Sequence, residues 1–158
     1  MAAIHSPEDI LTVLSGENRE VAAGLIGLAV KYDLKPELKY TAAKDTWKCG
    51  YTLKKPRRKI FTMWAAPDKF EIKANLFNLD EYSPDFDLSE AVKNRLLHSA
   101  YDCADCEGYR CGGVRFTLDG QSYHKCVFGA FSFTDLDAAD YRMLAALIER
   151  EIEAARRK

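Results

Sequence analysis

The sequence predicts an α+β fold, in which an antiparallel sheet of about five strands packs against N-terminal, central and C-terminal helices. Three observations lead to this prediction. Apolar residues recur at helical spacing near both ends of the chain, over 18–33 and 135–155. Between these stretches, apolar and polar residues alternate with a period of two, as in strands with one buried side. The dipeptide Asp119-Gly120 separates two such stretches and is typical of a two-residue hairpin turn.

The length of 158 residues fits one domain, and no repeat or low-complexity linker divides the chain. We therefore expect a single α+β domain over 1–158. Its expected parts are N-terminal helices over 6–33, a sheet and central helix over 45–100, a cysteine loop and hairpin over 101–133, and a C-terminal helix over 135–156.

The N-terminal helices have clear boundaries. Ser6 followed by Pro7 is a typical helix start, and this short helix should stop near Ser15. A second helix follows over about 18–33. Gly24 and Gly27 weaken it, so we expect close packing against a neighbouring element there.

The central part alternates as strands do over 47–53, 59–65 and 69–76. In the last of these stretches the apolar residues fall on one face and the charged residues on the other, which predicts a sheet with one covered and one wet side. The acidic stretch 80–87 contains a proline and predicts a surface loop. Ser89 should cap a helix that runs to about Ser99.

The last third predicts a hairpin and a helix. Strands over 114–118 and 121–133 flank the Asp119-Gly120 turn. Thr134-Asp135 should cap the C-terminal helix.

Composition excludes several classes of function. The formal net charge of −1 supplies no overall field that would attract nucleic acid or an anionic membrane. No apolar run reaches the roughly 20 residues of a membrane span, so no membrane partner is expected. The chain begins without a basic and apolar leader, so we expect a cytoplasmic protein with reduced thiols. Common motifs of hydrolases, metalloproteases and nucleotide-binding enzymes are missing, which leans against an enzyme.

Four cysteines, Cys103, Cys106, Cys111 and Cys126, form the pattern C-x2-C-x4-C-x14-C. A C-x2-C pair places two thiolates on one turn, and a tetrahedral zinc site brings two pairs of ligands together. The glycines at 108, 112 and 113 would let the backbone approach a metal closely. The pattern therefore predicts a structural zinc site.

The hairpin places two of these cysteines near each other. If Leu118 pairs with Gln121, Arg115 faces His124 and Gly113 faces Cys126. Cys111 and Cys126 then lie diagonally on the non-core face, about 7–8 Å apart at Cα. His124 shares that face and could replace one cysteine as a ligand.

Other interpretations of the cysteines stay open. They could be partly buried thiols without a ligand. Cys103 and Cys106 could form a redox pair, or the cysteines could form disulfides. Three cysteines could also hold a catalytic metal with one open position. Cys49 is expected to be an ordinary strand residue.

Two further features could bind a partner. The basic run 54–59 could grip phosphates, or it could be a solvated hairpin tip. Trp47, Tyr51 and Trp64 stand on neighbouring predicted strands and could line a ligand pocket, or they could belong to the core.

The stretch from Trp47-Lys-Cys-Gly-Tyr51 to Lys73-Ala-Asn-Leu76 precedes a helix, a hairpin and a terminal helix. This order, over roughly 35–155, resembles uncharacterised bacterial domain families with a YdhG/YjbR/CyaY-like α+β layout. The resemblance implies a fold rather than an activity, and the cysteine cluster is not a general feature of that group.

Three hypotheses on function follow. The first is a small binding or interaction module, stabilised by a structural zinc site, that receives a small molecule or a protein on the wet side of its sheet near Trp47, Tyr51 and Trp64. The second is a redox or metal-dependent enzyme that uses the cysteine cluster. The third, and weakest, is nucleic-acid binding through the basic run.

Overall fold

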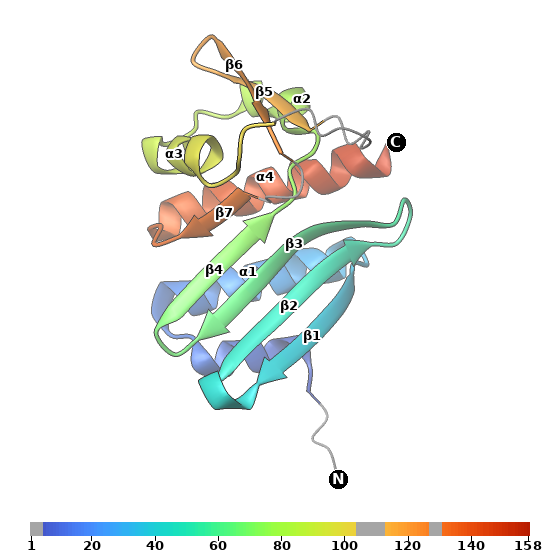
Figure 1. The fold of residues 1–158 in the computed structure, drawn as a ribbon. Helices are drawn as coiled ribbons and strands as arrows, with labels where there is room; N and C mark the ends of the chain where they lie inside the picture. The colour runs from blue at the N-terminus through green and yellow to red at the C-terminus, as the bar shows by residue number, and fades with distance from the viewer. Residues whose placement is uncertain (1–4, 104–112, 127–130) are drawn as a thin grey trace.

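The structure is a computed structural model, and it describes residues 5–103, 113–126 and 131–158. Among these residues, five antiparallel strands form one sheet in the order β1-β2-β3-β4-β7, and two more form a separate hairpin (Figure 1). The sheet strands are β1 (Lys35–Thr41), β2 (Thr46–Leu53), β3 (Arg58–Ala66), β4 (Lys69–Ala74) and β7 (Phe131–Thr134), and the hairpin strands are β5 (Val114–Leu118) and β6 (Gln121–Lys125). The predicted α+β class, with a sheet of about five antiparallel strands, is confirmed.

Two long helices, α1 (Gly16–Lys31) and α4 (Ala138–Arg156), lie behind the sheet in Figure 1, while its front face carries no helix among the described residues. Shorter helical elements complete the fold: η1 (Pro7–Val13), η2 (Ala42–Lys44), α2 (Leu79–Tyr82), η3 (Ser83–Asp85) and α3 (Glu90–His98). No helix of the described part of the chain is both long and apolar enough to cross a membrane.

The core lies between the sheet and the two long helices. The strand registers set Cys49 opposite Met63, Met63 opposite Ile72 and Ile72 opposite Phe133, so these side chains share the helix-covered face. All four are fully buried. The helices contribute apolar stripes that include Leu25, Leu144 and Ile148. The predicted covered and wet sides of the sheet are therefore present.

The strands predicted over 47–53, 59–65 and 69–76 are confirmed as β2, β3 and β4, whereas the two outer strands of the sheet differ from those expected. β1 was not predicted, because its residues are almost all exposed and Pro36 interrupts the pattern; a strand at the edge of a sheet tolerates both. The predicted strand 121–133 is in fact two strands. β6 stays in the hairpin, whereas β7 pairs with β4 and completes the main sheet.

The local signals at turns and caps were mostly correct. Ser89 caps α3, since its hydroxyl accepts a hydrogen bond from the amide of Val92 at 3.3 Å. Asp119 and Gly120 both have positive φ, at 51° and 80°, as a two-residue hairpin turn of the predicted kind requires. The predicted cap of α4 was two residues early, because the carboxylate of Asp137 accepts from the amide of Asp140 at 2.8 Å.

Two expectations about packing were wrong. The acidic stretch after residue 78 is not a loop but contains α2, and Leu79 and Tyr82 of that helix are buried. Gly24 and Gly27 do not pack closely against a neighbour, because a Cβ atom added at either position would meet nothing within 4 Å.

Candidate functional site

The sheet face opposite α1 and α4, here called the uncovered face, carries polar and charged side chains. Its rows follow from the registers: Lys39 stands opposite Lys48, Lys48 opposite Trp64, and Trp64 opposite Glu71. We define the uncovered face as Lys35, Glu37, Lys39, Lys48, Gly50, Lys59, Thr62, Trp64, Lys69, Glu71, Lys73 and Ser132.

Trp64 lies at the centre of the uncovered face. The ammonium of Lys48 is 5.0 Å from its ring centroid and that of Lys73 is 4.9 Å away, close enough for cation–π attraction to both lysines. The indole is half-buried, whereas an aromatic side chain on the other face of the same strand would be covered by helices. A large apolar ring is thus held at the surface between two positive charges.

The charge of the uncovered face is strongly positive. Six lysines stand on it against two glutamates, although the whole chain is nearly neutral. Among the residues that the structure describes, none of the six lysines forms an ion pair within 4 Å. The carboxylate of Glu71 is already engaged, because the hydroxyl of Ser132 donates to it at 2.8 Å.

A hollow of about 360 Å³ adjoins Trp64 on this face. Its lining is formed by Lys44, Thr46, Trp64, Ala65, Ala66, Lys69, Glu71 and Lys73. Three ammonium groups therefore border a space large enough for a side chain of a partner.

A larger hollow, of about 660 Å³, lies at the β3–β4 turn beside the start of α1. Its lining includes the carboxylates of Asp68, Glu71 and Asp135 against the single ammonium of Lys69. No group around it points to a ligand, so size alone does not make it the better candidate. The smaller hollow is the better candidate, because the ring of Trp64 and three ammonium groups border it.

The three aromatic residues predicted to line one pocket do not share a surface. Trp47 and Tyr51 are 6% and 2% exposed on the helix-covered face, where Trp47 packs on Tyr40 and Tyr51 stacks on Phe61. Trp64 alone lies on the uncovered face. The sequence of β3 gives no clear signal for this position, because Ile60 and Thr62, which are in phase with Trp64, are buried as well as the residues at 61, 63 and 65.

The predicted cysteine site is described only in part. Cys106 and Cys111 lie outside the described residues. Cys103 and Cys126 belong to two paired segments, in which the amide of Cys103 donates to the carbonyl of His124 at 3.0 Å and the amide of Cys126 donates to that of Tyr101 at 2.7 Å. In this antiparallel register the side chains of Cys103, His124 and Cys126 fall on one face.

The predicted hairpin register is confirmed, since Arg115 pairs with His124 and Val114 with Lys125. The next position along this ladder is Gly113, with φ of 67°. A Cβ atom there would come within 2.4 Å of Nε2 of His124, so the imidazole lies against the glycine backbone. Within 5–103, 113–126 and 131–158, no three His, Cys, Asp or Glu side chains gather closely enough to hold a metal ion.

The opposite face of these segments holds a buried lysine. Lys125 is 6% exposed, and its ammonium donates to the carbonyl of Leu97 at 2.6 Å and to the carboxylate of Asp102 at 2.7 Å. The hydrogen bond and charge of Lys125 lower the pKa of Asp102. This contact fixes the segment 101–103 between β6 and the end of α3.

The basic run 54–59 does not form one surface. Lys54 pairs with Asp33 at 2.9 Å, the guanidinium of Arg58 lies 5.0 Å from the ring of Phe77, and Lys59 belongs to the uncovered face. The remaining exposed cations at the β2–β3 turn are Lys55 and Arg57.

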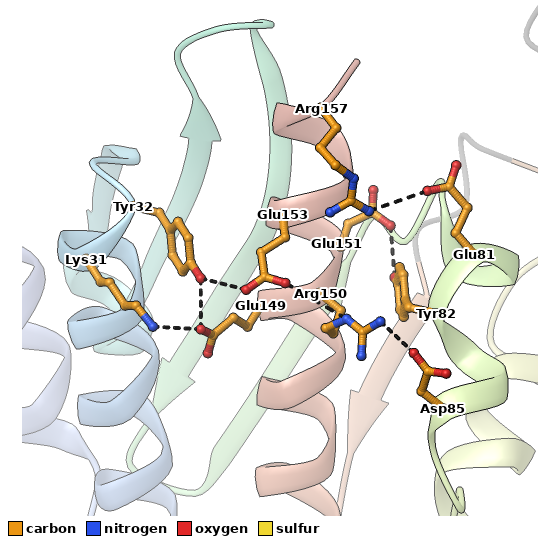
Figure 2. A network of polar contacts seen from close by, with 10 residues as sticks. All are labelled: Lys31, Tyr32, Glu81, Tyr82, Asp85, Glu149, Arg150, Glu151, Glu153 and Arg157. Carbon is orange, nitrogen blue, oxygen red and sulfur yellow. Dashed lines mark hydrogen bonds and ion pairs between the residues drawn. The ribbon is translucent and has the colours of Figure 1, made fainter.

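A polar network joins α1, α4 and the α2–η3 segment on the other side of the molecule (Figure 2). Glu149 of α4 accepts from Lys31 at 2.8 Å and from the hydroxyl of Tyr32 at 2.9 Å, and these bonds lower its pKa. Arg150 reaches Asp85 at 2.6 Å. These contacts are mostly exposed and connect helices to one another.

Glu151 is the buried member of this network. It is fully buried, and its carboxylate accepts from the amide and the side chain of Asn78 at 2.9 and 2.8 Å and from the hydroxyl of Tyr82 at 2.9 Å. Burial raises the pKa of Glu151. The helical spacing indicates this buried position, because Glu151 follows Leu144 and Ile148 on the buried stripe of α4.

Comparisons with protein-family models, curated proteins and solved structures find no match to this chain.

Proposed function

We propose that the protein is a small binding module whose uncovered face receives a partner around Trp64. The observation that carries this proposal is the position of Trp64, half-buried between Lys48 and Lys73 on a face without a helix over it. Tryptophan is enriched among residues that dominate binding energy, and positive residues around it can orient a partner.

Two further observations support this role. The lysines of the uncovered face form no ion pair with the described residues, so a partner of opposite charge would gain attraction without breaking one of the ion pairs described above. The hollow beside Trp64 adds a recess into which a side chain could fit.

Site-specific photo-crosslinking tests the proposal. A photoreactive residue at Lys39, exposed on the uncovered face, should yield a discrete adduct in cells of the source organism. The same residue at Val30 of α1, which is 75% exposed on the other side, is the matched control and should not yield that adduct. An adduct that forms equally at both positions, or one at Lys39 that survives Trp64→Ala unchanged, would contradict the proposal.

We also propose, as a second and separate role, that the cysteine cluster holds a structural zinc ion. Its support is the register that brings Cys103, His124 and Cys126 onto one face, together with the spacing of Cys106 and Cys111 in the sequence. Thiolate ligands must come from cysteines that are not in disulfides, and the cytoplasm, which we propose as the location of the protein, keeps thiols reduced.

Metal analysis tests this second role directly. Protein purified without added metal should contain about one zinc ion per chain, as expected for a four-ligand site. Replacing both Cys103 and Cys126 by serine should remove it, while Cys49→Ala, in the core of the sheet, should leave the zinc content unchanged. Metal-free protein with every thiol titratable would contradict the zinc proposal and leave the binding face untouched.

A further inference from the structure

We infer that the partner of the uncovered face is an extended acidic segment of a protein. This inference rests on the proposed function, because it names the chemistry of what binds around Trp64. Three properties of the face lead to it: the distribution of charge, the spacing of the lysines, and the kind of cation that is present.

The first step is the segregation of charge. Several cations on the helix side are paired with carboxylates, as Lys31 is with Glu149 and Arg150 is with Asp85. On the uncovered face, six lysines have no such partner among the described residues, and one of the two glutamates is bound by Ser132. A surface with this excess of positive charge is complementary to a row of carboxylates.

The second step is spacing. Lys69 and Lys73 stand four residues apart on β4, so their Cα atoms are about 13 Å apart at 3.3 Å per residue. Lys39 and Lys48 are opposite each other on neighbouring strands, about 5 Å apart. An extended segment with acidic residues at alternate positions presents carboxylates about 6.6 Å apart on one side, so successive groups can reach different lysines of this grid.

The third step favours an acidic peptide over a nucleic acid as the partner. Single-stranded nucleic acids bind where several aromatic rings offer open faces for stacking, with arginines beside the phosphates. The uncovered face has one aromatic ring, which already has two ammonium groups near it, and its cations are all lysines. Ammonium groups act as point charges that pair with carboxylates without bidentate geometry.

The hollow beside Trp64 gives the segment an anchor. Lys44, Lys69 and Lys73 border it, and Glu71 is turned toward Ser132 by its hydrogen bond. One carboxylate of the segment would enter there, while the chain beside it covers the indole ring.

The test uses a fluorescently labelled peptide of alternating glutamate and serine, measured by anisotropy at about 0.1 M salt, where charges are screened beyond about 10 Å. The full-length protein should bind it, with affinity that falls as salt is added. The double variant Lys48→Glu with Lys73→Glu should weaken binding at least about tenfold, because it places like charges against the carboxylates. The control, Lys55→Glu with Arg57→Glu, makes the same change of charge at the exposed β2–β3 turn and should stay within about twofold, since a distant charge is screened.

Each other outcome has a defined meaning. Equal binding of the matching glutamine–serine peptide, or an equal loss in the turn variant, would overturn the acidic-segment inference and leave the photo-crosslinking result to decide the proposed function. Tighter binding of oligothymidylate than of the peptide would replace the inference with nucleic-acid binding. Absence of peptide binding to the unmodified protein would also overturn it. Lys48→Gln with Lys73→Gln, which removes charge without adding repulsion, guards against misfolding of the first variant and should weaken binding in the same direction.

Discussion

Replacing Glu151 by alanine is expected to destabilise the protein severely. The change leaves three donors without an acceptor: the amide and side-chain nitrogen of Asn78 and the hydroxyl of Tyr82. The Tyr82 hydroxyl is buried, and a buried donor that loses its partner costs about 1–3 kcal/mol; the two Asn78 donors are part-buried and add less each, so we expect a total of about 3 kcal/mol. For a chain of this size, that corresponds to a fall in melting temperature of about 10 °C.

Thermal and urea unfolding, followed by circular dichroism, measure this loss. The matched control is Glu153→Ala on the same helix, where the side chain is 40% exposed and contacts the hydroxyl of Tyr32. Its cost should stay below about 1 kcal/mol, as for other exposed polar contacts. If the two variants lose equal stability, then Glu151 does not hold α2 against α4 and the reasoning is refuted.

The remaining predictions concern pH and four glycines. Because burial raises the pKa of Glu151, the contribution of this group to stability is full below the unfolded carboxyl pKa of about 4.3 and is lost as pH rises through the folded pKa. The unfolding free energy of the wild type minus that of Glu151→Gln should therefore fall with rising pH. A difference that rises with pH would contradict this prediction. Gly24→Ala and Gly27→Ala should each stabilise the protein by about 0.5–1 kcal/mol, since both lie within α1 with open space at Cβ; urea unfolding showing a loss would mean that something covers this helix. Gly113→Ala should cost about 1–3 kcal/mol more than Gly120→Ala, because both have positive φ but only the first collides with a neighbouring side chain, and equal melting temperatures would refute this.

The parts of the fold that the sequence predicted correctly depend on local chemistry. Ser89 starts α3 through its own hydroxyl, and Asp119-Gly120 turns the hairpin through backbone conformations that these residues tolerate. The register that follows from this turn placed His124 opposite Arg115 correctly. Each of these features needs only residues that are close in sequence.

The parts that the sequence did not predict depend on contacts between distant segments. β1 is an exposed edge strand with no alternation to detect, and its place in the sheet depends on β2. The pairing of β7 with β4 joins residues about sixty positions apart, which no local pattern encodes. The acidic segment that contains Tyr82 is held against α4 by a hydrogen bond from the Tyr82 hydroxyl to Glu151, which lies far along the chain.

The candidate site shows both situations. The period of two within β2 correctly placed Trp47 and Tyr51 on one side of their strand. Buried residues occupy both sides of β3 from Ile60 to Met63, so the outward position of Trp64 could not be predicted. The pairing of Lys48 and Lys73 with its ring could not be predicted either, because the two lysines come from different strands whose register is set by the whole sheet.

Chemical-shift mapping with the glutamate–serine peptide tests most directly the claim that the uncovered face is the binding surface. On addition of the peptide, the backbone amides of Lys48 and Lys73 and the indole N–H of Trp64 should shift together, while amides of α1 and α4 stay in place. Shifts that cluster on α1 around Gly24 and Val30, and leave Trp64 unmoved, would contradict the account.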